Sequence, residues 1–182
     1  TRMLREELGM VARCKPIVLK NGDIIMGFEH KDGYSYFMIS ENMGETWFWT
    51  EPLLGVKNQH PTLIQRVVCV VRINALTVKA VFCALCSSKP EFEYCLDESN
   101  AQTNEHKANE KDGSILALLR PSDVYRRIGK SISFDNGRTW SPAVNTDLPN
   151  PHAAIDMVKL ADGRVVLAFN NNEHQRNPLT LA

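Results

Sequence analysis

Carboxylate and arginine side chains lie next to short apolar segments of this chain, where such groups can transfer protons and bind anions. Asp156 and Glu29 each adjoin an apolar segment. Partial burial there could raise the pKa of a carboxyl group, so the two are candidates for the acid and base pair that glycoside cleavage requires. Arg120 follows the apolar residues 115–119, and a guanidinium at a strand end can bind a sugar carboxylate through two parallel hydrogen bonds. The alternative is a structural role for each: a hydrogen bond to backbone at a hairpin end for the carboxylates, and an ion pair for Arg120.

The elements that must position these side chains are short hairpins that repeat along the chain. Residues 15–28 contain two apolar segments around an Asn-Gly pair, and residues 156–169 repeat the pattern around Asp-Gly. Both pairs favour the positive φ angles of tight hairpin turns. A third copy is split, with its opening strand at 61–65 and its turn and second strand at 111–119. The pattern predicts an all-β chain.

The segment 66–110 interrupts this repeat. Gly113 and Gly163, which mark two of the turns, are 50 residues apart, whereas Gly22 and Gly113 are 91 apart, or 46 once the 45 residues of the segment are removed. The segment contains no glycine and no tryptophan, but it holds four of the five cysteines. We therefore predict that 1–182 is one partial domain, interrupted by an insertion at 66–110.

This inserted segment has two possible origins. One is a genuine excursion of the chain, such as a helix with a flexible tail. The other is non-native coding, such as an intron retained in frame, and it is favoured because joining the flanks restores a complete hairpin. Cys83 and Cys86 have C-x-x-C spacing, but no second pair accompanies them, so neither a zinc site nor a redox site is predicted.

Two further segments share the pattern S-x-D-x-G-x-T-W. Residues 133–140 match it at every fixed position, and residues 40–47 match it with Asn42 in place of Asp. The pattern is the Asp-box, and the chain resembles the sialidase-like (neuraminidase) family with BNR repeats. Further segments that resemble this family are 14–17, 60–63, 118–121, 146–150 and 155–179. The boxes are expected to serve folding, because the carboxylate of Asp135 can accept backbone hydrogen bonds in a tight turn and Asn42 keeps an acceptor.

The resemblance implies a β-propeller of four-stranded antiparallel blades, six-bladed when complete. Without the inserted segment the chain has 137 residues. At roughly 40–50 residues a blade, this length corresponds to under three blades. We therefore expect open sheet edges and a chain that is a fragment of a propeller.

Blade geometry selects the candidate binding residues. The turn between the first two strands and the Asp-box lie at one end of a blade, so residues before the first strand and after the second lie at the other end, where sialidase-like folds bind substrate. Lys15, His60 and His152 precede first strands, although Lys15 fits an ordinary solvated cation equally well. The family binds sialic acid through an arginine cluster, which implies this role for Arg120 and Arg176. Sialidases use a tyrosine nucleophile, but no tyrosine here falls in a matching motif, so none is assigned.

These observations predict a sialidase-like glycoside hydrolase that acts on terminal acidic sugars of glycans without a metal or another cofactor. A non-catalytic Asp-box propeller that binds glycans or proteins, a propeller polysaccharide lyase and an inactive fragment are the alternatives. Lys and Arg number 21, as do Asp and Glu, a balance that argues against a nucleic-acid partner and a polybasic membrane surface. The longest apolar stretch, 67–86, carries charged residues and is a poor membrane span. The compartment is not determined.

Overall fold

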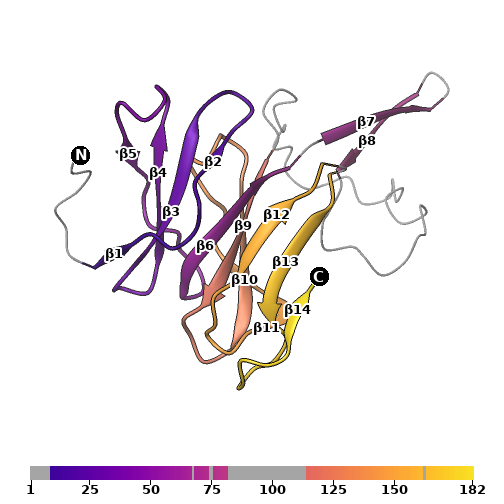
Figure 1. Cartoon of the computed structure of the whole chain (residues 1–182). Coiled ribbons are helices and arrows are strands. Elements are labelled where there is room, and N and C mark those ends of the chain that lie inside the picture. The colour runs from indigo at the N-terminus through magenta and orange to yellow at the C-terminus, as the bar shows by residue number, and fades with distance from the viewer. Residues whose placement is uncertain (1–8, 67, 74–75, 82–113, 162) are drawn as a thin grey trace.

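The computed structural model describes residues 9–66, 68–73, 76–81, 114–161 and 163–182, and every regular element among them is a β-strand. Three antiparallel sheets lie side by side (Figure 1). The first consists of β1 (Met10–Val11), β2 (Ile17–Val18), β3 (Ile24–His30), β4 (Ser35–Ser40) and β5 (Phe48–Trp49). The second consists of β6 (Asn58–Gln65), β9 (Ile115–Pro121), β10 (Arg127–Ser133) and β11 (Val144–Pro149). The third consists of β12 (Asp156–Lys159), β13 (Val165–Asn170) and β14 (Leu179–Leu181).

Each sheet follows the order of the chain, as in a propeller blade. The second sheet has the strand order β6-β9-β10-β11. In the first sheet β1 and β2 both pair with the same edge of β3, so together they form a first strand that is interrupted at residues 12–16. The all-β fold of four-stranded antiparallel blades, fewer than three in this chain, is thus confirmed, and the sheets do not close into a ring.

The inserted segment leaves the second sheet between β6 and β9. Gln65 and Ile115 are direct partners across these strands, and the N–H of Arg66 donates to the carbonyl of Ser114 at 2.8 Å. The two strands of the split hairpin predicted from the sequence therefore pair. Within the insertion, β7 (Val68–Ile73) and β8 (Leu76–Val81) pair as a separate two-stranded sheet that projects from the blades (Figure 1), so a helix is the wrong prediction for these residues. Residues 82–113, with Cys83 and Cys86, lie outside the described part, and the origin of the insertion stays a prediction.

Strand β9 contributes to two hydrophobic cores because its side chains alternate between the two faces of the middle sheet. Ile115, Ala117 and Leu119 pack into the core shared with the first sheet, which includes Phe37. Leu116 and Leu118 pack into the core shared with the third sheet. The third sheet supplies the following side chains to this second core: Ile155, Met157, Leu167 and Phe169. The middle sheet is therefore buried on both faces, as a central blade must be.

The two Asp-boxes close the turns that follow β4 and β10. In the second box, Asp135 accepts hydrogen bonds from the N–H and the hydroxyl of Thr139, and the N–H of Gly137 donates to the hydroxyl of Ser133 at 2.8 Å. In the first box, the side-chain oxygen of Asn42 accepts the corresponding backbone hydrogen bond at 2.8 Å. The hydrogen bonds expected within the boxes are present, including those of the box in which Asn replaces Asp.

The second box also joins its sheet to the first sheet. The ring of Trp140 stacks on Phe37 of β4 with centroids 4.3 Å apart and planes tilted by 20°. Gly137 has a φ of 87°, and a side chain there would lie 2.4 Å from the side chain of Ile25. Arg138 contacts the carboxylates of Asp23 and Glu41 in the first sheet. The box therefore fixes neighbouring blades at the end opposite the candidate site.

Candidate functional site

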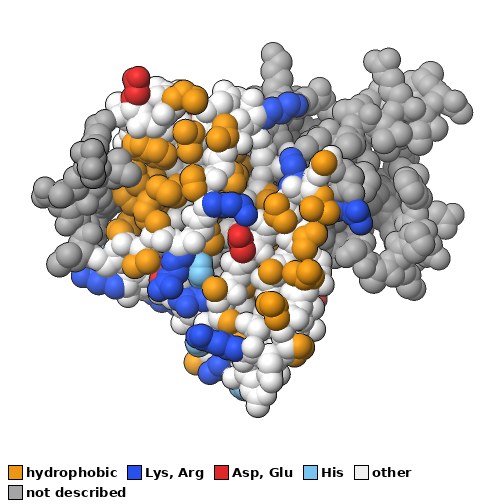
Figure 2. Space-filling model, in the orientation of Figure 1, with side chains coloured by type: hydrophobic (Ala, Val, Ile, Leu, Met, Phe, Trp, Pro, Cys, Tyr) orange, Lys and Arg blue, Asp and Glu red, His pale blue; other side chains and the backbone are white. Residues whose placement is uncertain are grey.

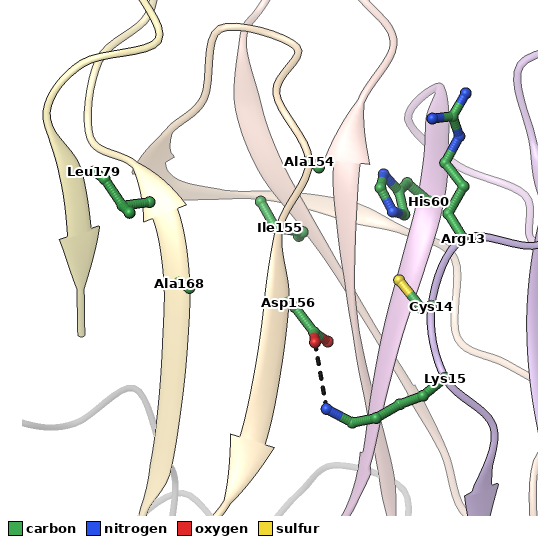
Figure 3. A pocket seen from close by; sticks show the side chains of 9 residues that line it. All are labelled: Arg13, Cys14, Lys15, His60, Ala154, Ile155, Asp156, Ala168 and Leu179. Atoms are coloured by element: carbon green, nitrogen blue, oxygen red, sulfur yellow. Dashed lines mark hydrogen bonds and ion pairs between the residues drawn. The ribbon is translucent and has the colours of Figure 1, made fainter.

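A cavity of about 530 Å³ opens at the end of the sheets away from the Asp-boxes. Its walls come from three parts of the chain: residues 13–15 between β1 and β2, His60 of β6, and the third sheet with residues 154–156, Ala168 and Leu179. In Figure 3, Cys14 and His60 lie across the cavity from Ala168 and Leu179, with Asp156 between them. Figure 2 shows Lys and Arg side chains gathered on the lower part of this face, with apolar side chains to either side. The cavity therefore combines cationic and apolar walls.

Asp156 stands at the first position of β12 and is held by three donors. Its Oδ1 accepts hydrogen bonds from the hydroxyl of Thr62 at 2.8 Å and from the N–H of Met157 at 2.9 Å. Its Oδ2 lies 3.3 Å from the Nζ of Lys15, toward which it points in Figure 3. The side chain of Asp156 borders the cavity and is 54% exposed, so it is only partly buried. The carboxylate is oriented but remains open to a ligand.

Glu29 holds two arginines beside the cavity. Its Oε1 lies 2.9 Å from the Nε of Arg13, and its Oε2 lies 3.4 Å from the guanidinium of Arg120. The side chain of Glu29 is only 9% exposed, whereas that of Arg13 is 51% exposed. Arg120 also donates to the side-chain oxygen of Gln59, its neighbour across β6 and β9. The geometry makes Glu29 a bridge between two cations, because arginine donors occupy both of its oxygens.

His60 lies in the wall of the cavity with 7% of its surface exposed. Burial lowers the pKa of its imidazole, and the nearby charges act in both directions: Glu29 and Asp156 raise it, whereas Arg120 and Arg13 lower it. The net effect is a lowered pKa, which favours the neutral ring.

The thiol of Cys14 belongs to the same wall. Burial raises its pKa to about 12, and the negative charge of Asp156 acts in the same direction. A thiol with so high a pKa stays protonated and is a poor nucleophile. Cys14 therefore adds apolar surface to the cavity.

The structure brings together five of the seven residues that the sequence selected. Lys15, His60 and Asp156 line the cavity, and Glu29 and Arg120 are linked to it through Arg13. The two residues that it does not bring there are His152 and Arg176. His152 Nε2 lies 2.7 Å from the carbonyl of Asp123, and Arg176 is exposed, with its backbone carbonyl accepting a hydrogen bond from Asn170.

Three polar residues of the site were missed by the sequence analysis: Arg13, Gln59 and Thr62. Arg13 precedes the family-like segment 14–17, but no periodic pattern surrounds it. Gln59 and Thr62 lie close to the candidate His60 on the same strand, β6. Gln59 faces Arg120 through strand pairing, and the hydroxyl of Thr62 reaches Asp156 of the neighbouring sheet. The sequence reveals neither relationship.

The described residues contain no helix with the length and apolarity needed to cross a membrane. In the same residues, no three His, Cys, Asp or Glu side chains are grouped so that they could hold a metal ion.

Comparison with known proteins relates the whole chain to one family. The model of the family described as BNR repeat-like domain matches residues 4–182. A search of curated proteins gives no match.

Three solved structures share the fold. A protein of unknown function from Dyadobacter fermentans is 16% identical, with a TM-score of 0.54 over 94% of this chain and 36% of that one. A variant of the NanB sialidase from Streptococcus pneumoniae is 16% identical, with a TM-score of 0.57 over 91% of this chain and 20% of that one. A leech intramolecular trans-sialidase, also 16% identical, has a TM-score of 0.52 over 89% of this chain and 19% of that one. This chain thus spans about a third or less of these proteins, and identities this low establish the fold alone.

Proposed function

Because the chain belongs to the BNR repeat-like domain family, we propose that it is a sialidase-like glycoside hydrolase that acts on the terminal acidic sugars of glycans. The observation that carries this proposal is the composition of the cavity: cationic Arg13 and Lys15 and the half-exposed carboxylate of Asp156 line a single space. An acidic sugar needs cations for its carboxylate, and cleavage of its glycosidic bond needs a group that transfers a proton.

Arg13 and Arg120 are the proposed ligands of the sugar carboxylate. Guanidinium groups bind carboxylates through paired hydrogen bonds. Arg13 lines the cavity, and Glu29 joins Arg120 to it from behind this wall residue. Glu29 is then a positioning residue, because its own oxygens are occupied, and the acid and base chemistry falls to Asp156. Lys15 and Thr62 orient the carboxylate of Asp156 through its two oxygens.

The test is the release of a fluorophore from a synthetic sialoside. We expect R120A to lower kcat/KM by about 100-fold, the effect of losing a charged hydrogen-bond donor to the substrate. D156N should lower kcat with a smaller effect on KM. R176A is the matched control, because Arg176 is exposed and, unlike Arg120, forms no ion pair with Glu29 beside the cavity, and it should remain within twofold of the wild type.

Two results would count against this proposal. One is a folded wild-type protein that releases nothing from a panel of acidic glycosides. The other is an equal loss of activity in R176A and R120A.

A non-catalytic glycan-binding role is the second candidate. One observation favours it: among the described residues that line the cavity, Asp156 is the sole carboxylate and no tyrosine is present, whereas glycoside cleavage commonly uses two carboxylates or a tyrosine nucleophile. A wild-type protein that binds N-acetylneuraminate in an NMR titration but releases no fluorophore would support binding alone. In that case D156N should retain the affinity.

A further inference from the structure

Strand β6 carries a local irregularity at His60. Gln59 pairs with Arg120, and the next pair along the strands is Thr62 with Leu118, so His60 and Pro61 together face a single residue of β9. Such a β-bulge redirects a side chain from its regular place on the strand. His60 has a φ of 53°, a left-handed conformation that is strained for a residue other than glycine.

The neighbouring sheet holds this bulge in place. A side chain at Gly27 of β3 would lie 2.4 Å from the Cγ of Pro61, so the absence of one lets the ring of Pro61 pack against the first sheet. A proline favours extended backbone in the residue before it, so the left-handed φ of His60 is adopted against that preference, in a segment that the packing of Pro61 on Gly27 holds in place. The strained conformation of His60 is therefore supported by the contact between Pro61 and the first sheet.

The imidazole that this bulge places in the cavity wall has no polar partner within the described part of the chain. Only 7% of the surface of His60 is exposed, and its Nδ1 is closed off from solvent and has no hydrogen-bond partner. Buried polar groups are nearly always hydrogen-bonded, so an unpartnered ring in a cavity wall calls for an explanation. Because Nδ1 is closed off from solvent, a ligand in the cavity would meet the other ring nitrogen, Nε2. Strained backbone and an unpartnered polar group at one residue, in a cavity wall, both point to a ligand.

The charged groups around His60 determine what kind of group it can bind. Glu29 of β3 and Asp156 of β12 face it, but each carboxylate is already held by other cations. Arg120 of β9 and Arg13 also face it, and Lys15 lines the same cavity. A neutral imidazole among these groups carries one donor and one acceptor, which matches a hydroxyl group and not a second anion.

We propose that His60 is a specificity-determining residue that hydrogen-bonds a hydroxyl group of the acidic sugar. This role rests on the proposed binding of the sugar carboxylate by Arg13 and Arg120, which places the rest of the ring between His60 and Asp156. The arginines then select for an acidic sugar, and His60 selects among acidic sugars by the position of a hydroxyl.

Two variants of His60 separate binding from folding. Glycine adopts a φ of 53° without strain and removes the imidazole, so H60G should fold with unchanged or higher stability. Asparagine tolerates the same φ and keeps both a donor and an acceptor. In titrations with N-acetylneuraminate we expect H60G to bind about tenfold more weakly than the wild type, the value of one hydrogen bond, and H60N to recover part of this loss.

The hydroxyl itself is identified with monodeoxy derivatives of N-acetylneuraminate. The derivative that lacks the hydroxyl bound by His60 should bind the wild type about tenfold more weakly than N-acetylneuraminate does. It should bind H60G as tightly as N-acetylneuraminate binds H60G. Binding of N-acetylneuraminate by H60G within twofold of the wild type, together with loss of binding in R120A, would overturn the role of His60 and leave the proposed function standing. A wild-type protein that binds no acidic sugar would overturn both.

Discussion

Gln65 and Ile115 are direct partners across β6 and β9, although residues 66–114 separate them along the chain. The bond from the N–H of Arg66 to the carbonyl of Ser114 continues the ladder past this pair. The middle sheet is thus complete up to the point where the chain leaves it.

The first prediction follows from this pairing: a chain in which Gln65 is joined directly to Lys111 should fold into the same three sheets. The shorter connection lowers the entropy cost of closing the loop by about 2 kcal/mol. The free energy of unfolding should therefore stay equal or rise by up to this amount, as measured by urea denaturation. A deletion variant that fails to fold, while the parent chain folds, would show that the segment 66–110 contributes to the domain.

The second prediction concerns the charge in the second Asp-box. Burial raises the pKa of Asp135, but hydrogen bonds from Thr139 and Ser133 outweigh it and hold this pKa below the ordinary value of 3.8. The resulting stabilisation is present above pH 3.8 and is lost as the pH falls through the lowered pKa. We expect D135A to lower the free energy of unfolding by about 2 kcal/mol and D135N by about 1 kcal/mol, because Asn keeps one acceptor. An equal decrease in the free energy of unfolding for D135A and D135N would show that the acceptor retained by Asn does not stabilise the box.

The third prediction tests the packing behind the His60 bulge. G27A should lower the free energy of unfolding by about 1–3 kcal/mol, since the new methyl group would overlap the ring of Pro61. In the double variant G27A/P61A the ring is gone, so the two substitutions should be strongly non-additive in a double-mutant cycle. Simple additivity would show that Gly27 and Pro61 do not restrain each other.

The fourth prediction is a dependence of stability on pH that comes from His60. Its pKa in the folded chain is lowered from 6.5, so the unfolded chain binds the proton more readily. The free energy of unfolding is therefore unaffected by His60 above pH 6.5. It falls as the pH drops from 6.5 toward the lowered pKa, because the unfolded chain takes up the proton first. Thermal unfolding at pH 7.5 and at pH 5 should show a smaller difference in H60N than in the wild type. Identical pH profiles for the two proteins would contradict the buried, neutral state of His60.

The hairpins and the Asp-boxes could be predicted from the sequence because their signals are local. Gly22 and Gly163 have φ angles of 93° and 89°, which is what Asn-Gly and Asp-Gly turns require. The hydrogen bonds of Asn42 likewise join residues within one box. Such features depend on neighbours in the chain, so a single sequence is enough to find them.

The composition of the site could be predicted only in part, because it depends on how sheets are placed beside one another. Arg13 lies in the interruption between β1 and β2, and its role becomes visible only through Glu29 at the far end of β3. His152 precedes β12, the first strand of its sheet, but its Nε2 lies 2.7 Å from the carbonyl of Asp123 and the residue does not line the cavity. Blade geometry predicts at which end of a blade a residue lies, but it does not predict whether its side chain reaches the cavity.

The alternation of β9 between two cores has a consequence for how the molecule loses its structure. Ile115 and Leu116 are adjacent in sequence but support different sheets, so the middle sheet cannot open without exposing apolar surface on both of its neighbours. The three sheets should then behave as one cooperative unit. Amide protons of β9 should exchange with solvent only through global unfolding, and those of β14, at the outer edge of the third sheet, through local fraying.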